Sequence, residues 1–98
     1  MTERHCTELS LTLPEYPYDA LVVVLLPSGE GELYRERAPT TPLGQIRRGW
    51  SGWETHRPDQ VNGWVGHATV EDAVRWIVET RIELGDLTLS RVEPGVAS

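Results

Sequence analysis

The sequence predicts an α+β domain, in which a single, mainly antiparallel sheet of about five to six short strands packs against one long amphipathic helix. Several short segments alternate apolar and polar residues with period two and are separated by turns rich in Pro and Gly, which is typical of strands. Residues 69–84 instead combine apolar side chains at helical spacing with start and stop signals at both ends. Placing that helix on one face of the sheet buries the apolar side of both.

The chain has the size of one small globular domain. Its 98 residues are 39% hydrophobic and 24% charged, and four Trp and three Tyr are too many aromatic residues for a disordered chain. A chain of this length buries only about two-thirds of its unfolded surface, which leaves little room for a deep active site. We expect one domain over residues 9–92, with a flexible N-terminus at 1–8 and a flexible tail at 93–98.

The first two strands are predicted on either side of a connection that contains two prolines. Leu alternates with Ser and Thr over residues 9–13, as in a strand with one buried face. Pro14 and Pro17 end this strand because each fixes the backbone and lacks an N–H group. The continuous apolar run at 20–26 then predicts a central strand that is covered on both faces.

Two hairpins are predicted further along the chain. The turn-forming residues at 27–31 connect the apolar run to a return strand at 32–38. Residues 50–56 and 61–67 predict two more strands around a turn at 57–60. We expect each pair to be antiparallel because short turns join the strands.

The signals between these hairpins conflict. Thr41 as N-cap and Pro42 at the first helical position would frame a short helix over 42–48. Gly44 weakens that helix by about 1 kcal/mol relative to Ala. The alternative is a strand through Ile46.

The helix over 69–84 has the clearest boundaries. Thr69 and Asp72 have the form of a capping box, in which each side chain accepts a hydrogen bond from the backbone N–H of the other. Gly85 stands where a helix ends in a left-handed residue. Beyond it, residues 87–92 alternate again and predict a last strand.

Charge and cysteine content narrow the function. The net charge of −6 and the isoelectric point near 4.9 oppose non-specific attraction to nucleic acid or to an anionic membrane. The lone Cys6 excludes an internal disulfide, so nothing requires an oxidising compartment. The longest apolar run, seven residues, is too short to span a bilayer, and no targeting signal is visible. We expect a cytoplasmic protein that does not bind membranes.

The most distinctive feature is a group of Trp, Arg and His residues between positions 47 and 67, which we call the Trp/Arg/His group. Trp50 and Trp53 would lie on opposite faces of a regular strand, so one should face away from the core unless residues 51–52 form a bulge. Exposed Trp residues are enriched in binding hot spots. The alternative is that a domain without Phe uses Trp to fill its core. The group consists of Trp50, Trp53, Trp64, Arg47, Arg48, Arg57, His56 and His67.

The same group suits a protein partner or, as an alternative, a nucleic acid. Aromatic rings beside arginines are what base stacking and phosphate pairing require, although the total charge opposes them. The last two predicted strands and the start of the helix, which carries a Gly followed by Thr-x-Glu-acidic-Ala at 66–73, resemble in outline the three-stranded sheet and helix of plant AP2-type and integrase arm-binding DNA domains. That resemblance implies DNA contact through a basic sheet face. Since this chain has few basic residues, we do not assign it to that family.

A metal-dependent or His-based enzyme is the third hypothesis. His5, Cys6, His56 and His67 are suitable Zn²⁺ ligands, but they lack the close-paired spacing of known sites. Neighbouring acidic and hydroxyl side chains could act as acid–base or nucleophilic groups, yet they suit a turn or a polar strand face equally well. Because the sequence carries no catalytic, cofactor, metal or nucleotide motif, we expect neither an enzyme nor a bound cofactor.

We therefore expect a non-enzymatic module that binds another protein, as an adaptor, inhibitor or immunity-type protein. The contact is either the Trp/Arg/His group or the acidic side of the predicted helix, which would suit a basic partner. Arg81 falls within the apolar side of that helix and, if it is buried, needs a carboxylate partner or a ligand. Homodimer formation through exposed sheet edges stays open. The acidic side consists of Glu71, Asp72, Glu79 and Glu83.

Overall fold

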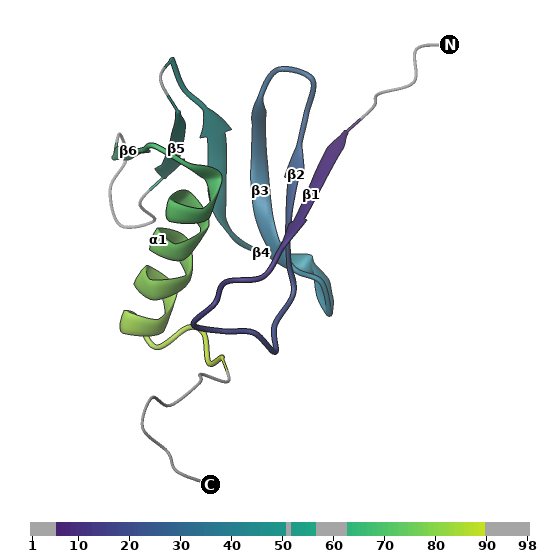
Figure 1. The fold of residues 1–98 in the computed structure, drawn as a ribbon, viewed down its shortest axis with the longest axis vertical. Coiled ribbons are helices and arrows are strands. Elements are labelled where there is room, and N and C mark those ends of the chain that lie inside the picture. Colours follow the sequence, from purple (N-terminus) through teal and green to yellow (C-terminus); the bar gives the residue numbers. More distant parts are fainter. Residues whose placement is uncertain (1–5, 51, 57–62, 90–98) are drawn as a thin grey trace, which may run out of the picture.

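The computed structural model describes residues 6–50, 52–56 and 63–89, and these residues form the α+β arrangement that the sequence predicts (Figure 1). Within the described residues, six strands precede one helix. In order they are β1 (Thr7–Leu11), β2 (Leu21–Leu25), β3 (Glu30–Arg35), β4 (Ala38–Arg48), β5 (Trp53–His56), β6 (Trp64–His67) and α1 (Val70–Glu83).

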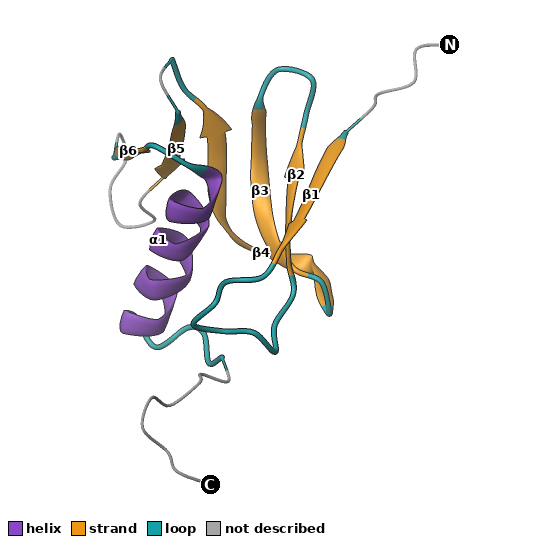
Figure 2. Ribbon diagram, in the orientation of Figure 1, coloured by secondary structure: helices purple, strands orange, loops and turns teal. Residues whose placement is uncertain are grey.

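The strands form one sheet in which spatial order follows chain order. Each strand pairs antiparallel with the next, and β1 and β6 are the two edges. The predicted hairpins are confirmed, since β3 pairs with β2 and β6 pairs with β5. Figure 2 shows α1 on one side of this sheet. We call the face toward α1 the helix side and the opposite face the open face.

The helix side holds the core. The helix contacts β4, β5 and β6, while residues of the 12–20 connection complete the layer near β1 to β3. The buried apolar residues are Leu13, Tyr16, Leu21, Val23, Leu25, Leu33, Leu43, Ile46, Ala73, Val74, Ile77, Val78 and Leu87.

Strand β2 is covered on the helix side alone. Leu21, Val23 and Leu25 are buried, whereas Val22 and Val24 are half-buried on the open face. The prediction of a strand covered on both faces is therefore wrong. A meander of antiparallel strands with one helix has a single covering layer, so even an all-apolar strand keeps one face toward solvent.

The helix begins and ends where the sequence predicts. The backbone N–H of Asp72 donates to the Thr69 hydroxyl over 3.1 Å. At the other end Gly85 has φ +81°, its N–H donates to the carbonyl of Ile82, and the N–H of Asp86 donates to the carbonyl of Arg81. These two bonds satisfy carbonyl groups that the helix end would leave unpaired.

The short helix predicted over 42–48 is wrong, because these residues belong to β4. Pairing with β3 extends from Arg47 opposite Glu30 down to Ala38 opposite Arg35, and this pairing overrides the local helix signals. Gly44 has a packing role instead. A Cβ atom there would lie 2.9 Å from Cγ2 of Ile77, so its absence lets α1 approach the strand.

The last predicted strand is wrong over residues 87–89, which form no strand. Leu87 is buried and Leu89 is half-buried against the core, so their alternation reflects packing without strand pairing. Residues 90–92, the predicted turn at 57–60 and the predicted tail at 93–98 lie outside the described residues.

Ion pairs at Asp19 and Glu15 attach the 12–20 connection to the rest of the fold. Asp19, which is 4% exposed, accepts from a terminal nitrogen of Arg35 over 2.8 Å. Glu15 accepts from Arg75 on α1 through both of its carboxylate oxygens. The connection is thereby fixed to β3 and to the helix, which keeps Leu13 and Tyr16 in the core.

Candidate functional site

The sheet divides the Trp/Arg/His group between its two faces. Cross-strand partners share a face, and His56 pairs with Trp64 while Trp53 pairs with His67. Trp50 lies in the β4–β5 loop, where its side chain is fully exposed, and Arg57 lies outside the described residues. The open face carries Arg47, His56 and Trp64, and the helix side carries Arg48, Trp53 and His67.

The three open-face residues form one contact cluster. The guanidinium carbon of Arg47 lies 3.7 Å from the centre of the Trp64 ring. Its Nε donates to Oε1 of Glu54 over 2.8 Å. The ring of His56 meets Trp64 edge to face, with 5.2 Å between ring centres. Arg47 is therefore already paired with a carboxylate and stacked on a ring, so a phosphate would have to compete with Glu54.

A groove of about 440 Å³ continues from this cluster across the open face. We call it the open-face groove. Its apolar walls come from β2 and its flanking turn and from the rings on β3 and β6, and two carboxylates of β3 lie along it. Its main lining residues are Val24, Leu26, Glu30, Glu32, Tyr34 and Trp64.

Tyr34 and Glu32 interact within the groove. The Tyr34 hydroxyl donates to Oε1 of Glu32 over 3.1 Å. Desolvation, together with this bond and the charge of Glu32, raises the pKa of Tyr34, so the phenol stays protonated at neutral pH. Tyr34 and Glu32 are not among the site residues that the sequence predicts. The signal that could have found them is alternation on the return strand, because Glu32 and Tyr34 flank the buried Leu33 and must face the other way.

On the helix side, His67 belongs to the packing layer. Its Nε2 lies 2.9 Å from the hydroxyl of Thr55, which is fully buried, and its ring is 5.7 Å from the ring of Trp76 on α1. Burial lowers the pKa of His67 below its ordinary value, and the charge of Asp72 offsets part of that shift. Trp53 is half-buried against the same core. These contacts give both residues a structural role beneath the helix.

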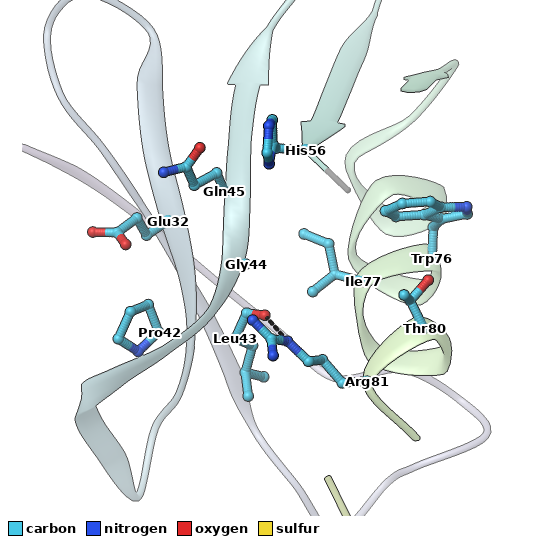
Figure 3. A pocket seen from close by; sticks show the side chains of 10 residues that line it. All are labelled: Glu32, Pro42, Leu43, Gly44, Gln45, His56, Trp76, Ile77, Thr80 and Arg81. Carbon is cyan, nitrogen blue, oxygen red and sulfur yellow. Dashed lines mark hydrogen bonds between the residues drawn. The ribbon is translucent and has the colours of Figure 1, made fainter. Parts of the chain in front are cut away.

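A second cavity lies between β4 and α1, and we call it the lateral pocket (Figure 3). Strand β4 has 11 residues, but its pairing with β5 covers only residues 46–48. Beside residues 42–45, where β5 has ended, the cavity has a volume of about 330 Å³. Figure 3 shows side chains of α1 along one wall and His56 near the end of β5. Its main lining residues are Leu43, Gly44, His56, Trp76, Ile77 and Arg81.

Arg81 connects α1 to β4 at the lower end of this pocket in Figure 3. Its Nε donates to the carbonyl of Leu43 over 2.6 Å, and NH1 donates to Oδ2 of Asp86 over 3.0 Å. Arg81 is half-buried, and its partners are a strand carbonyl together with a carboxylate.

The described residues form no group of three or more His, Cys, Asp and Glu side chains that could hold a metal ion. His56 and His67 lie on opposite faces of the sheet, and Cys6 is exposed just before β1 at the far edge. His5 lies outside the described residues. In the same part of the chain, no helix is long and apolar enough to cross a membrane.

Comparison with known proteins finds no matching family model, no matching curated protein and no matching solved structure. The roles of the open-face groove and the lateral pocket therefore have to be inferred from their own geometry.

Proposed function

We propose that this domain is a non-enzymatic protein-binding module, and that its contact surface is the open face of the sheet. The partner carries basic side chains and at least one apolar side chain at the contact. The observation that supports this most directly is the open-face groove, where apolar walls and two carboxylates lie together on a face that no described helix or strand covers.

The apolar part of the surface supports a macromolecular partner. This face carries four half-buried apolar or aromatic residues: Val22, Val24, Tyr34 and Trp64. The solvent-exposed face of an antiparallel sheet normally carries polar residues instead. Apolar and aromatic side chains that share an exposed patch are typical of protein interfaces. Trp64 is the expected hot spot, because Arg47 and His56 already hold its ring in one orientation.

The charges on the same face favour a basic partner. Arg47 is flanked across the strands by Glu30 on β3 and by Glu54 on β5, and the latter neutralises it directly. Glu30 and Glu32 then leave the groove with a negative charge, in agreement with the net charge of −6. Complementary charge would speed association with a basic surface and would repel phosphate groups.

A charge-reversal pair tests this proposal. Glu30→Arg with Glu32→Arg reverses the charge of the groove, and Glu79→Arg with Glu83→Arg makes the same total change on exposed positions of α1. Affinity capture from source-cell lysate with and without nuclease treatment, followed by binding of the purified partner at several salt concentrations, compares both variants with wild type. We expect the groove variant to lose at least about tenfold in affinity, while the helix variant keeps binding within about twofold.

Other outcomes locate the contact elsewhere. If the helix variant alone lost the partner, the contact would be the acidic side of α1 and the open-face proposal would be wrong. If capture disappeared with nuclease treatment, a nucleic-acid ligand would replace the protein partner. Thermal unfolding of each variant shows whether a loss of binding reflects a loss of fold.

A further inference from the structure

We propose that the lateral pocket receives one aromatic side chain, a Trp or Tyr ring, of the protein that binds the open face. Because the ring is assigned to that partner, this proposal rests on the proposed function. The lateral pocket and the open-face groove share Glu32 and Gln45 among their lining residues. The two cavities therefore adjoin across β3 and β4, and a single partner can reach both.

The size and walls of the pocket suit a single ring. Its volume of about 330 Å³ is near the lower limit of ligand pockets, which span roughly 300–1,000 Å³. Leu43 and Ile77 are buried and form an apolar floor, and Gly44 adds no side chain above it. The half-buried indole of Trp76 offers a surface for ring stacking.

The pocket is held open by contacts at its lower end and its middle. Arg81 links α1 to the carbonyl of Leu43 and is itself fixed by Asp86. Ile77 packs directly against the backbone at Gly44. The helix can therefore neither move closer to β4 nor swing away from it without breaking these contacts, and a ligand meets a preformed site.

The backbone of β4 disfavours an added strand at this position. Pro42 has no N–H group to donate, and the carbonyl of Leu43 already accepts from Arg81. Strand addition depends on a continuous series of main-chain hydrogen bonds, which these two residues interrupt. A side chain that enters the pocket needs no such series.

The polar groups of the pocket favour an aromatic ring over an aliphatic side chain. Gln45 and Thr80 line the cavity together with its apolar floor. An indole N–H or a phenol hydroxyl needs a hydrogen-bond partner when it is buried, and these side chains can supply one. A leucine side chain would fill the floor but would leave the same polar groups without a new partner.

Titration with small uncharged probes tests the pocket apart from any protein partner. The probes are N-acetyl-L-tryptophanamide and, as the matched aliphatic control, N-acetyl-L-leucinamide, each added to ¹⁵N-labelled protein. We expect the tryptophan probe to bind at least about tenfold more tightly and to shift the amide signals of Gly44 and Thr80 and the indole signal of Trp76. Equal binding of the two probes, or shifts confined to other residues, would overturn the proposal.

Two substitutions on neighbouring helix positions complete the test. Thr80→Phe fills the pocket from α1, whereas Glu79→Phe adds the same ring at an exposed position. We expect the first to weaken probe binding at least about tenfold and the second to leave it within about twofold. Thr80→Leu, a smaller replacement, is the second variant if Thr80→Phe fails to fold. Probe binding that is unchanged in a folded Thr80 variant would contradict the proposal.

The two proposals can fail separately. If the charge-reversed groove loses the partner while a folded Thr80→Phe variant keeps full affinity for that partner, the open-face contact stands and the assignment of the ring to the partner is wrong. If the probe binds wild type but the groove variant retains the partner, the pocket is a ring-binding site and the open-face proposal is wrong.

Discussion

The two faces of the sheet carry matching sets of residues in different surroundings. Each face has an arginine beside a tryptophan, Arg48 with Trp53 on the helix side and Arg47 with Trp64 on the open face. Each face also has a histidine, His67 on the helix side and His56 on the open face. In β2, the adjacent residues Val23 and Val24 likewise point to opposite faces. On the helix side Trp53 packs against the core and His67 lies beside Trp76 of α1, whereas on the open face Trp64 borders a groove. Residue type alone therefore does not determine the surroundings of these side chains; the side of the sheet does.

The histidines show this difference most clearly. His67 has a buried hydroxyl and the ring of Trp76 as neighbours, and burial lowers its pKa. His56 stacks edge to face on Trp64 and lines the lateral pocket at the end of β5. One histidine helps to hold the helix on the sheet, and the other lies between the two candidate binding cavities.

The largest effect is expected from the two tryptophans of the β4–β5 hairpin. Trp53→Ala removes a ring that packs against the core, so we expect about 2–3 kcal/mol of destabilisation. Trp50→Ala removes a fully exposed side chain and should change stability by less than about 0.5 kcal/mol. Urea unfolding of both variants measures the difference. Equal losses would mean that Trp50 packs in solution and would contradict its placement in an exposed loop.

A smaller effect is expected from adjacent positions on β2. Val23 is fully buried, and Val23→Ala should cost about 2 kcal/mol through lost burial and the cavity left behind. Val24→Ala lies on the open face, where we expect less than about 1 kcal/mol, together with weaker partner binding. Denaturant unfolding and partner titration check both values. A greater loss of stability at Val24 would show that another layer covers the open face.

The smallest effect is a pH dependence that arises from His67. Its folded-state pKa is lower than its unfolded value of about 6.5, so the unfolded chain binds the proton more readily. Above the unfolded-state pKa of about 6.5, His67 makes a constant contribution to the free energy of unfolding. As the pH drops from there toward the folded-state pKa, this contribution is lost and stability falls. Unfolding free energies between about pH 5 and pH 8 measure the slope. We expect His67→Gln to flatten this slope, and an unchanged slope in that variant would contradict the assignment to His67.

Local sequence signals were sufficient to predict those elements whose hydrogen bonds lie within the element or between elements adjacent in the chain. Thr69 and Gly85 mark the ends of α1 because capping bonds involve residues only a few positions apart. The β2–β3 and β5–β6 pairs agree with the turn-forming residues that the sequence has between the predicted strands of each pair. The signals at 42–48 and 87–89 misled because pairing with β3 and packing on the core are decided by distant residues.

The composition of the candidate site was visible in the sequence, but its arrangement was not. Trp, Arg and His cluster between positions 47 and 67, yet the sheet separates them, and Trp64 gains Tyr34, Glu30 and Glu32 as neighbours from a strand that is distant in the chain. Alternation along β3 could have identified which of its residues share a face, although not which of the two faces stays open.

The sequence by itself determined the fold class, the order of most elements and the ends of the helix, because these depend on periodicity, turns and caps within short stretches of chain. Only the tertiary structure decided which face of the sheet α1 covers, where β4 extends past β5, and which charges surround Arg47. The physical reason is that burial and charge pairing depend on contacts between residues far apart in the chain, and a period-two pattern has no means of distinguishing the covered face from the open one.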